Sequence, residues 1–474
     1  MNTTDSTLRQ GLSEVTERLV RDYGERAVTS RAVREQHSHG EGLADAGMPD
    51  IVVFPQTNDE VASIVGLCNA ARIPVIAFGV GTSLEGHVAA LYGGVCVDLS
   101  RMDRVLEVND ADLDCRVQAG VTREALNAEL KGTGLFFPID PGANATIGGM
   151  ASTRASGTNA VRYGTMRENV LGLTVVTADG RIVHTGGRAR KSSAGYDLTR
   201  LFVGAEGTLG IITEVQLRLY GLPEAISAAV CQFADLAGAV DTVIVAMQLG
   251  IPVARIELLD DVQMEACIRF SKLDGFKAKP TLFFEFHGTE AGVREQAETI
   301  ESIAADHGGS RFQWATAQED RSRLWKARHD AYYAALALAP GTQGFATDAC
   351  VPISRLTECV LETRADIAAT GLIAPIVGHV GDGNFHVVVL FDPAKPDERA
   401  KADGLAARVS ARAIRMGGTC TGEHGVGVHK LDALAAEHGD AVSLMQAVKR
   451  ALDPNDILNP GKTVPRPSSL APRS

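Results

Sequence analysis

The segment Phe78-Gly-Val-Gly-Thr-Ser-Leu-Glu-Gly-His87 is the most informative about architecture, because it places a glycine-rich turn directly after an apolar strand. Ile73–Phe78 predicts that strand, and the glycines allow backbone N–H groups to turn toward an anion. A second loop, Pro138-Ile-Asp-Pro-Gly-Ala-Asn-Ala-Thr-Ile-Gly-Gly-Met-Ala-Ser152, adds the hydroxyls of Thr146 and Ser152. Together they could hold a pyrophosphate, although a single such loop is more often only a tight strand connection. No GxGxxG opens a helix, so a Rossmann nicotinamide site is not indicated.

Length and composition set the class of protein. A chain of 474 residues exceeds one ordinary core, which predicts two or three domains. The net charge of −12 argues against nucleic acid as a partner. The eight cysteines are scattered without a CxxC pair, which favours free thiols in a reducing compartment.

The N-terminus is polar, and no apolar stretch approaches the ~20 residues of a transmembrane helix. We therefore expect a cytoplasmic protein without a membrane span. Peripheral contact with the inner face of the membrane and a homodimer are both compatible with the sequence.

Strand and helix patterns alternate along the chain, beginning with a lead-in helix at 8–22. The spacing predicts a helix from Asn58, as its N-cap, to Arg72. Strands are expected at 51–54, 73–78, 95–99, 105–108, 115–119, 171–178 and 181–185, and a helix at 122–131. Beyond Gly221-Leu-Pro223 we expect strands at 226–233, 253–259 and 281–288, alternating with helices at 235–248, 261–271 and 290–307. The region after about 425 has a helical pattern and a proline-rich tail.

Several near-contiguous motifs between about residue 50 and Lys462 carry a family resemblance. They are Gly79–Ser83, Asp140-Pro-Gly-Ala143, Thr146-Ile-Gly-Gly149, Arg162–Arg167 and Phe202-Val-Gly-Ala-Glu-Gly-Thr-Leu-Gly-Ile-Ile-Thr213. On these residues the chain resembles the FAD-linked oxidase superfamily of the vanillyl-alcohol-oxidase type. Within it, the chain is most similar to the FAD-dependent D-lactate dehydrogenases and the glycolate-oxidase flavin subunit.

The resemblance implies an α+β fold. We expect a two-subdomain FAD-binding domain at 1–222, an α+β substrate- and metal-binding cap domain with an antiparallel sheet at 223–424, and a helical segment returning to the FAD domain at 425–474. The implied cofactor-binding residues are Phe78, Gly79, Val80, Gly81, Thr82, Ser83, Gly86, His87, Pro141, Gly142, Ala143, Thr146, Ile147, Gly149, Ser152, Ala155, Gly157, Glu206, Gly210, Ile211, Ile212 and Asn459. The surroundings of His87 resemble those in the non-covalent members, so we expect dissociable FAD.

A histidine pair lies in Gly378-His-Val-Gly-Asp-Gly-Asn-Phe-His386, between the apolar runs 373–377 and 387–391. This pattern predicts a hairpin that turns at Asp382-Gly383. In a symmetric two- or four-residue loop, His379 and His386 would be directly opposed on one face. Their Cβ atoms would then lie about 4.5–5.5 Å apart, close enough for both rings to bind one ion.

Glu423, in Thr421-Gly-Glu-His-Gly425, can supply a third, anionic ligand. Two histidines and one carboxylate leave positions open for substrate, as in catalytic metal sites. Zn²⁺, Mn²⁺ and Fe²⁺ all fit this ligand set. A lone histidine is more often structural, but the paired spacing favours the metal interpretation.

His424 would be the base, because a neutral imidazole can take a hydroxyl proton near pH 7. Arg328 matches the family position that binds the substrate carboxylate, and an exposed helical arginine is the alternative. Asn384 would contact the substrate carboxylate or only favour the turn. The resemblance assigns the same roles to His379, His386, Glu423 and His424.

The substrate is expected to be D-lactate or a close small D-2-hydroxy acid, oxidised to the 2-oxo acid with hydride transfer to flavin. The resemblance implies an extra basic residue shortly before a Val/Leu-Pro element in relatives that act on 2-hydroxyglutarate, whereas Thr347-Asp-Ala-Cys-Val-Pro352 carries no lysine or arginine. The alternatives are a glycolate oxidase flavin subunit, a D-2-hydroxyglutarate dehydrogenase, a metal-dependent hydrolase and a catalytically silent flavoprotein subunit. The electron acceptor stays open between a quinone, a cytochrome, an electron-transfer flavoprotein and oxygen.

Overall fold

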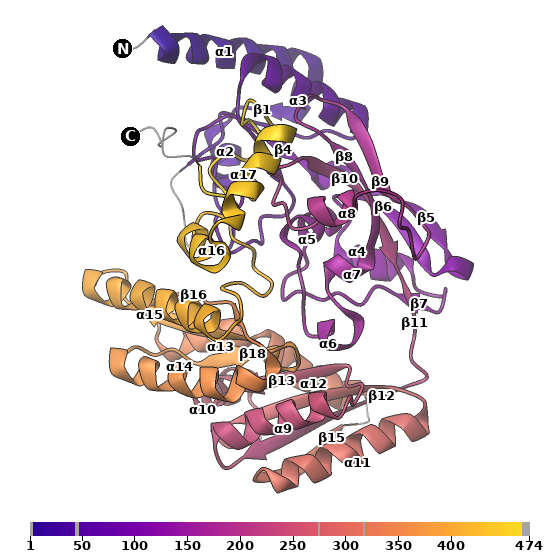
Figure 1. Ribbon diagram of the computed structural model, residues 1–474, viewed down its shortest axis with the longest axis vertical. Helices are drawn as coiled ribbons and strands as arrows, with labels where there is room; N and C mark the ends of the chain where they lie inside the picture. Colours follow the sequence, from indigo (N-terminus) through magenta and orange to yellow (C-terminus); the bar gives the residue numbers. More distant parts are fainter. Residues whose placement is uncertain (1–2, 43–46, 274, 316–317, 467–474) are drawn as a thin grey trace. The chain divides into compact units, whose positions relative to one another are not determined.

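The computed structural model describes residues 3–42, 47–273, 275–315 and 318–466 (Figure 1). The chain forms two compact units. The first consists of Met1–Ala155, Thr165–Gly221 and Glu423–Ser474, and the second of Ser156–Gly164 and Leu222–Gly422.

One sheet of the first unit has the strand order β1-β2-β4-β3, in which β2, β4 and β3 run parallel. Its strands are β1 (Ala27–Val28), β2 (Ile51–Val53), β3 (Val75–Phe78) and β4 (Val95–Asp98). The helices of this part are α1 (Thr3–Tyr23), α2 (Arg31–Gln36) and α3 (Asn58–Ala71). Val61, Ile64, Val65 and Cys68 recur at helical spacing and bury one face of α3 in this core.

The N-cap of α3 is Thr57, whose hydroxyl accepts the amide hydrogen of Glu60 at 3.2 Å. The prediction of Asn58 as the cap is therefore wrong by one residue. Asn58 instead donates its side-chain amide to Glu214 at 2.8 Å, a tertiary contact that competes with capping.

The other large sheet of the first unit is antiparallel, in the order β5-β6-β10-β8-β9. Its strands are β5 (Val105–Asn109), β6 (Asp114–Gln118), β8 (Val170–Val176), β9 (Ile182–Gly186) and β10 (Ile211–Arg218), and a separate pair joins β7 (Leu135–Phe136) to β11 (Tyr220–Gly221). The helices are α4 (Arg123–Glu129), α5 (Ile147–Thr153), α7 (Met166–Asn169), α8 (Leu198–Phe202), α16 (Leu431–His438) and α17 (Ala441–Leu452).

The second unit is built on one antiparallel sheet in the order β15-β12-β14-β13-β18-β19-β16, with β17 also paired to β19. Its strands are β12 (Ala225–Phe233), β13 (Arg255–Leu259), β14 (Thr281–Gly288), β15 (Gly309–Ala315), β16 (Gln343–Ala346), β17 (Ala349–Cys350), β18 (Ile376–Gly378) and β19 (Asn384–Phe391). The antiparallel sheet and the mixed α+β class are as predicted.

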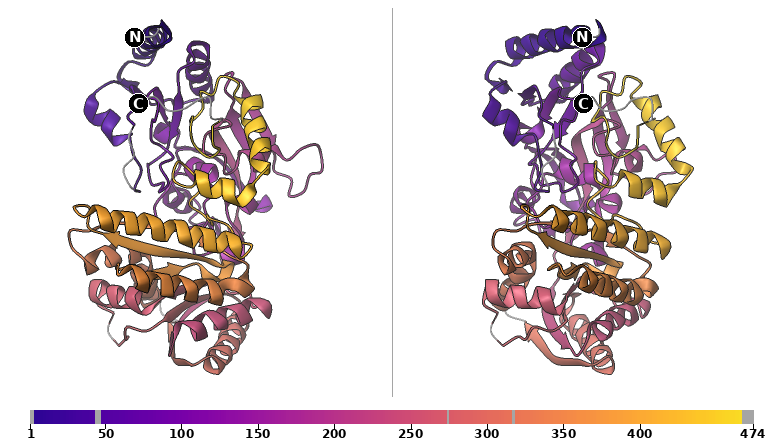
Figure 2. Two further views of the ribbon diagram at one scale, coloured as in Figure 1. Left: turned by 60° about the vertical axis from the view of Figure 1, so that its left-hand side comes forward. Right: turned by 90° about the vertical axis from the view of Figure 1, so that its left-hand side faces the viewer.

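Helices cover both faces of this sheet. They are α6 (Ala160–Tyr163), α9 (Leu236–Gln248), α10 (Asp261–Ser271), α11 (Glu290–Asp306), α12 (Gln318–His329), α13 (Ala331–Leu338), α14 (Leu356–Thr370) and α15 (Pro396–Arg415). The helices α15, α14, α9 and α11 are neighbours in that order on one face (Figure 2). The other face shares an apolar core with α10, α12 and α13, to which Leu259 of β13 and Val388 of β19 contribute. Side chains alternate along a strand, so Glu257 and His386 also point to this second face.

All eight cysteines are free thiols, as predicted. Among the described helices, none is long and apolar enough to cross a membrane.

Candidate functional site

His379 and His386 come from the hairpin of β18 and β19, whose register differs from the predicted one. Val377 lies opposite His386, so the prediction that His379 is directly opposed to His386 is wrong. The loop is also longer than a turn at Asp382-Gly383, because a 3-10 turn at 380–382 precedes Gly383 in a left-handed conformation (φ +78°).

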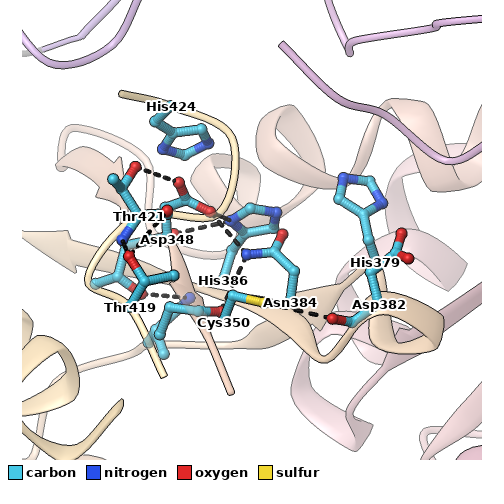
Figure 3. Close-up of polar contacts among 12 residues, drawn as sticks. Asp348, Cys350, His379, Asp382, Asn384, His386, Thr419, Thr421 and His424 are labelled. Carbon is cyan, nitrogen blue, oxygen red and sulfur yellow. Dashed lines mark hydrogen bonds and ion pairs between the residues drawn. The ribbon is translucent and has the colours of Figure 1, made fainter. Parts of the chain in front are cut away.

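The two imidazoles nevertheless lie close together. His379 stands two residues beyond Val377, on the same face as His386. The ring centroids are 5.4 Å apart and the ring planes are nearly perpendicular, at 83° (Figure 3). The pair is therefore diagonal rather than directly opposed.

Hydrogen bonds define which nitrogen of each ring can bind a ligand. Nδ1 of His386 lies 2.9 Å from the carbonyl oxygen of Thr347, and Nδ1 of His379 lies 2.7 Å from Oε1 of Glu257. Carbonyl and carboxylate oxygens only accept, so Nδ1 donates in both rings. The lone pair of each neutral imidazole is then on Nε2. A ring nitrogen of one histidine lies within 4.8 Å of a ring nitrogen of the other, which suits a shared ion.

Glu257 on β13 has no solvent exposure and accepts hydrogen bonds from two partners. Its Oε1 accepts from His379, and its Oε2 lies 2.8 Å from Nε and 2.6 Å from Nη2 of Arg328. Burial raises the pKa of Glu257, but the contacts with His379 and Arg328 outweigh burial and lower it below its usual value. The sequence analysis missed Glu257, and its one signal was a charged residue inside the apolar strand Arg255–Leu259.

Arg328 is buried on α12, at 8% exposure. It is therefore not the exposed helical arginine of the alternative interpretation. Glu257 engages its Nε–Nη2 edge, which holds the guanidinium plane in one orientation.

Asn384 points its amide nitrogen into the protein. Nδ2 donates to Oδ1 of Asp348 at 2.8 Å and to the carbonyl oxygen of Ala349 at 3.0 Å (Figure 3). Both partners only accept, which fixes the orientation of the amide. Oδ1 is thus the group that Asn384 can offer to a ligand, and within the described residues it has no hydrogen-bond partner. A carboxamide oxygen cannot donate to a carboxylate, but it can accept from a hydroxyl.

Thr421 also donates its hydroxyl to the buried Asp348, at 2.8 Å. Glu423 follows two residues later and begins the last segment of the first unit. His424 belongs to that segment, and its Nδ1 lies 3.4 Å from Oε1 of Glu85.

Glu85 lies within the first glycine-rich loop, and the sequence analysis assigned it no role. Its buried carboxylate is 2.9 Å from Nζ of Lys430 and 3.4 Å from Nδ1 of His429, besides its contact with His424. Burial raises the pKa of Glu85, but Lys430 and the two histidines lower it well below its ordinary value. Glu85 is therefore an anion placed against one nitrogen of His424.

The two glycine-rich loops of the sequence lie against each other. A Cβ atom at Gly79 would stand 2.3 Å from Oγ1 of Thr146, which is the N-cap of α5. Among the described residues, the buried hydroxyl of Ser83 has no hydrogen-bond partner. Burying an unpaired hydroxyl is unfavourable, so this loop fits a polar group of a ligand.

The returning C-terminal segment contacts the first of these loops and Glu206. Nδ2 of Asn459 donates to the carbonyl oxygens of His87, at 3.0 Å, and of Glu206, at 2.7 Å. The carboxylate of Glu206 accepts from the amides of Val426 and Gly427 and from the Thr463 hydroxyl. Asn459 thus links His87 of the first glycine-rich loop to Glu206, whose carboxylate binds the returning segment.

The other residues predicted to bind the cofactor are divided between the two units. Ser152 accepts the amide hydrogen of Glu206 through its carbonyl oxygen, and a Cβ atom at Gly210 would stand 2.4 Å from Val175. Gly157 belongs to the second unit. The rest lie in the first unit: Phe78, Val80, Gly81, Thr82, Gly86, Pro141, Gly142, Ala143, Ile147, Gly149, Ala155, Ile211 and Ile212.

Family comparisons cover most of the chain. Residues 49–186 match the family described as FAD binding domain, and residues 222–463 match the C-terminal domain of FAD linked oxidases. The fold matches that of 4-ethylphenol oxidase from Gulosibacter chungangensis with a TM-score of 0.81 at 19% identity, over 98% of each chain.

Three relatives are similar along nearly the whole sequence. The probable mitochondrial D-lactate dehydrogenase of Danio rerio is 53% identical, over 91% of this chain and 88% of that protein. The mitochondrial D-lactate dehydrogenase [cytochrome] of Arabidopsis thaliana is 46% identical, over 94% and 78%. Glycolate oxidase subunit GlcD of Bacillus subtilis is 35% identical, over 95% and 96%.

Proposed function

Because this chain belongs to the FAD-linked oxidase family, we propose that it oxidises D-lactate, or a close small D-2-hydroxy acid, to the 2-oxo acid. The observation that carries this proposal is 53% identity over 91% of the chain to a protein named as a probable D-lactate dehydrogenase. Family membership also argues against the alternative of a metal-dependent hydrolase, since a hydrolase has no use for a redox cofactor.

FAD would be held without a covalent bond by the two glycine-rich loops. The close approach of Gly79 to Thr146 supports that location, as does the Ser83 hydroxyl, which has no hydrogen-bond partner in the part of the chain that the structure describes. A divalent ion, Zn²⁺, Mn²⁺ or Fe²⁺, would be held by His379, His386 and Glu423. The Nε2 lone pairs of the two histidines and their spacing support this ligand set.

When bound, the ion would supply Lewis acidity at the substrate hydroxyl, and FAD would supply a two-electron acceptor. His424 would take the hydroxyl proton. We assign this to Nε2, because Nδ1 faces the carboxylate of Glu85. The adjacent anion stabilises the imidazolium that forms.

Arg328 would bind the substrate carboxylate, with its guanidinium already oriented by Glu257. Asn384 would face the substrate through Oδ1 and would not donate to its carboxylate, since both amide hydrogens are engaged. Thr347–Pro352 lacks a basic residue, which supports a monocarboxylate over 2-hydroxyglutarate.

A cytochrome is the electron acceptor that we favour over a quinone, an electron-transfer flavoprotein or oxygen, because the relative from Arabidopsis thaliana is named for one. The free state of all eight cysteines supports a reducing compartment such as the cytoplasm. Glycolate is the second candidate substrate, on the similarity to GlcD of Bacillus subtilis.

Anaerobic flavin bleaching tests the proposal directly. The purified protein is mixed with D-lactate, L-lactate, glycolate and D-2-hydroxyglutarate, each with and without a chelator. Fast bleaching with D-lactate that the chelator abolishes is the expected result. Faster bleaching with glycolate would move the assignment to the second candidate, and no bleaching with any acid would refute the dehydrogenase.

A further inference from the structure

Glu257 divides its two carboxylate oxygens between two residues with different proposed tasks. Oε1 accepts from Nδ1 of His379, and Oε2 binds the Nε–Nη2 edge of Arg328. The three contacts span 2.6–2.8 Å, and Glu257 is fully buried. Charge-assisted hydrogen bonds of this length are strong and directional, so neither partner can rotate without breaking one.

We propose that Glu257 is a positioning residue that couples the metal ligand His379 to the substrate-binding Arg328. This inference rests on the function proposed above. One buried carboxylate would hold the imidazole in the tautomer that binds metal and hold the guanidinium in the plane that receives the substrate carboxylate. The spacing between the two would then be set by one side chain.

The backbone supports such a role. Glu257 lies on β13, at the centre of the sheet, between β14 and β18. Leu258 and Leu259 pair directly with Gly378 and Val377 of β18, immediately before His379. Arg328 reaches the same sheet face from α12. A carboxylate that is fixed on a central strand moves less than one on a loop.

Glu257→Gln keeps the size of the side chain but changes its hydrogen bonding, so it separates the positioning role from a role in packing. Both neighbours donate to Glu257, but glutamine has one accepting oxygen and one donating amide. If the amide faces His379, the ring must accept on Nδ1, and its proton moves to Nε2, where a metal would bind. If the amide faces Arg328, the guanidinium loses its acceptor. In either arrangement Glu257→Gln loses the native hydrogen bond to one partner, His379 or Arg328.

Glu257→Asp keeps the charge but is one methylene shorter, so it cannot reach both partners. Arg328→Lys changes the partner of Oε2 and leaves Glu257 itself intact. Arg328 is not among the proposed metal ligands, so a lysine there alters metal binding only if Glu257 transmits the change. The metal affinity of Arg328→Lys therefore distinguishes coupling through Glu257 from a role of Arg328 in substrate binding alone.

Glu285 on the neighbouring strand β14 offers a matched control. Its buried Oε1 lies 2.9 Å from Nε2 of His287 and 3.4 Å from Nε of Arg255. It is thus another buried carboxylate between a histidine and an arginine on this sheet. Glu285→Gln should impose a similar structural cost without touching His379 or Arg328.

The experiment titrates Mn²⁺ into the FAD-loaded protein without substrate and measures free Mn²⁺ by electron paramagnetic resonance. The dissociation constant should rise about 10- to 100-fold in Glu257→Gln and Glu257→Asp, and by roughly tenfold in Arg328→Lys. Glu285→Gln should bind as the wild type does. At saturating Mn²⁺, KM for D-lactate should rise more than kcat falls in Glu257→Gln.

Wild-type affinity for Mn²⁺ in Arg328→Lys would overturn the coupling, whatever the Glu257 variants show. If the Glu257 variants do not fold, Arg328→Lys alone decides. His379→Ala separates this failure from that of the proposed function. A loss of Mn²⁺ binding in His379→Ala with intact binding in Arg328→Lys refutes only the coupling, whereas unchanged binding in His379→Ala refutes the metal site and the coupling together.

Discussion

The carboxylate of Glu206 accepts the backbone amide hydrogen of Val426 at 2.7 Å, across 220 residues of sequence. The same carboxylate binds the amide of Gly427 at 2.8 Å and the hydroxyl of Thr463 at 2.7 Å, and Nε2 of His87 lies 3.4 Å away. Glu206 is buried, at 5% exposure. One side chain therefore joins the C-terminal segment to the body of the first unit.

Glu206→Gln should destabilise the first unit. Glutamine has one accepting oxygen where the carboxylate has two, so at least one buried donor would lose its partner, at a cost of about 1–3 kcal/mol. Urea denaturation of the FAD-loaded protein measures the loss. Glu129→Gln, at an exposed position of α4, is the control and should be neutral. Equal midpoints for the two variants would contradict the role of Glu206.

His37 should make stability depend on pH. Its Nδ1 lies 2.7 Å from the carbonyl oxygen of Val33 and its Nε2 lies 2.8 Å from Oδ2 of Asp98, so both nitrogens must donate. Burial lowers the pKa of His37, but the bonds with Asp98 and Val33 outweigh burial and raise it. A raised pKa means that this stabilisation is complete below about pH 6.5 and is lost as pH rises through the folded-state value.

His37→Gln should therefore flatten the pH dependence of the free energy of unfolding above about pH 6.5. Denaturant titrations of both proteins between pH 6 and 9 provide the measurement. The exposed His438→Gln serves as the control. A His37→Gln profile parallel to that of the wild type would exclude this contribution.

His424→Ala should retain FAD and metal but lose substrate-driven flavin reduction. Removal of a general base typically costs 10²–10⁴-fold in rate, so a loss of that order is expected. Stopped-flow absorbance under anaerobic conditions measures the reduction. His438→Ala, on α16 of the same segment, should reduce at the wild-type rate. Near-wild-type reduction in His424→Ala would remove this residue from the mechanism.

Gly79→Ala should weaken FAD binding, because the new Cβ atom would stand 2.3 Å from Oγ1 of Thr146. Gly79→Ala/Thr146→Ala removes that oxygen, so the two changes should be non-additive in a double-mutant cycle. Fluorescence titration of the apoprotein with FAD gives the affinities. Gly66→Ala, in α3 with open space around the new methyl group, should bind FAD normally. Additive losses would show that steric contact with Thr146 is not the cause.

The fold was predictable where short-range signals agreed. Asp235, Asp260 and Thr289 cap α9, α10 and α11, and the apolar patterns between them alternate with the predicted strands. The motifs of the first unit were also sufficient to predict the family and the α+β class, which the comparisons confirm.

The details that the sequence could not predict depend on distant contacts. In the hairpin loop, the amide of Val351 donates to the carbonyl oxygen of Gly383, and a Cβ atom at Gly383 would stand 2.2 Å from the carbonyl oxygen of Val351. A local sequence pattern does not report a contact between segments this far apart, so it could not predict the conformation of this loop. Glu257 escaped prediction for the same reason, since its partners Arg328 and His379 are 71 and 122 residues away.

The interruption of the first unit by Leu222–Gly422 has a consequence for biosynthesis. Leu458 pairs with Val75, the first residue of β3, and Asn459 donates its backbone amide hydrogen to the carbonyl oxygen of Val75. These partners leave the ribosome only after the whole inserted segment. Domains usually fold in the order in which they are made. Here the first unit is the last to be completed, because its segment from Glu423 onward is made after the second unit.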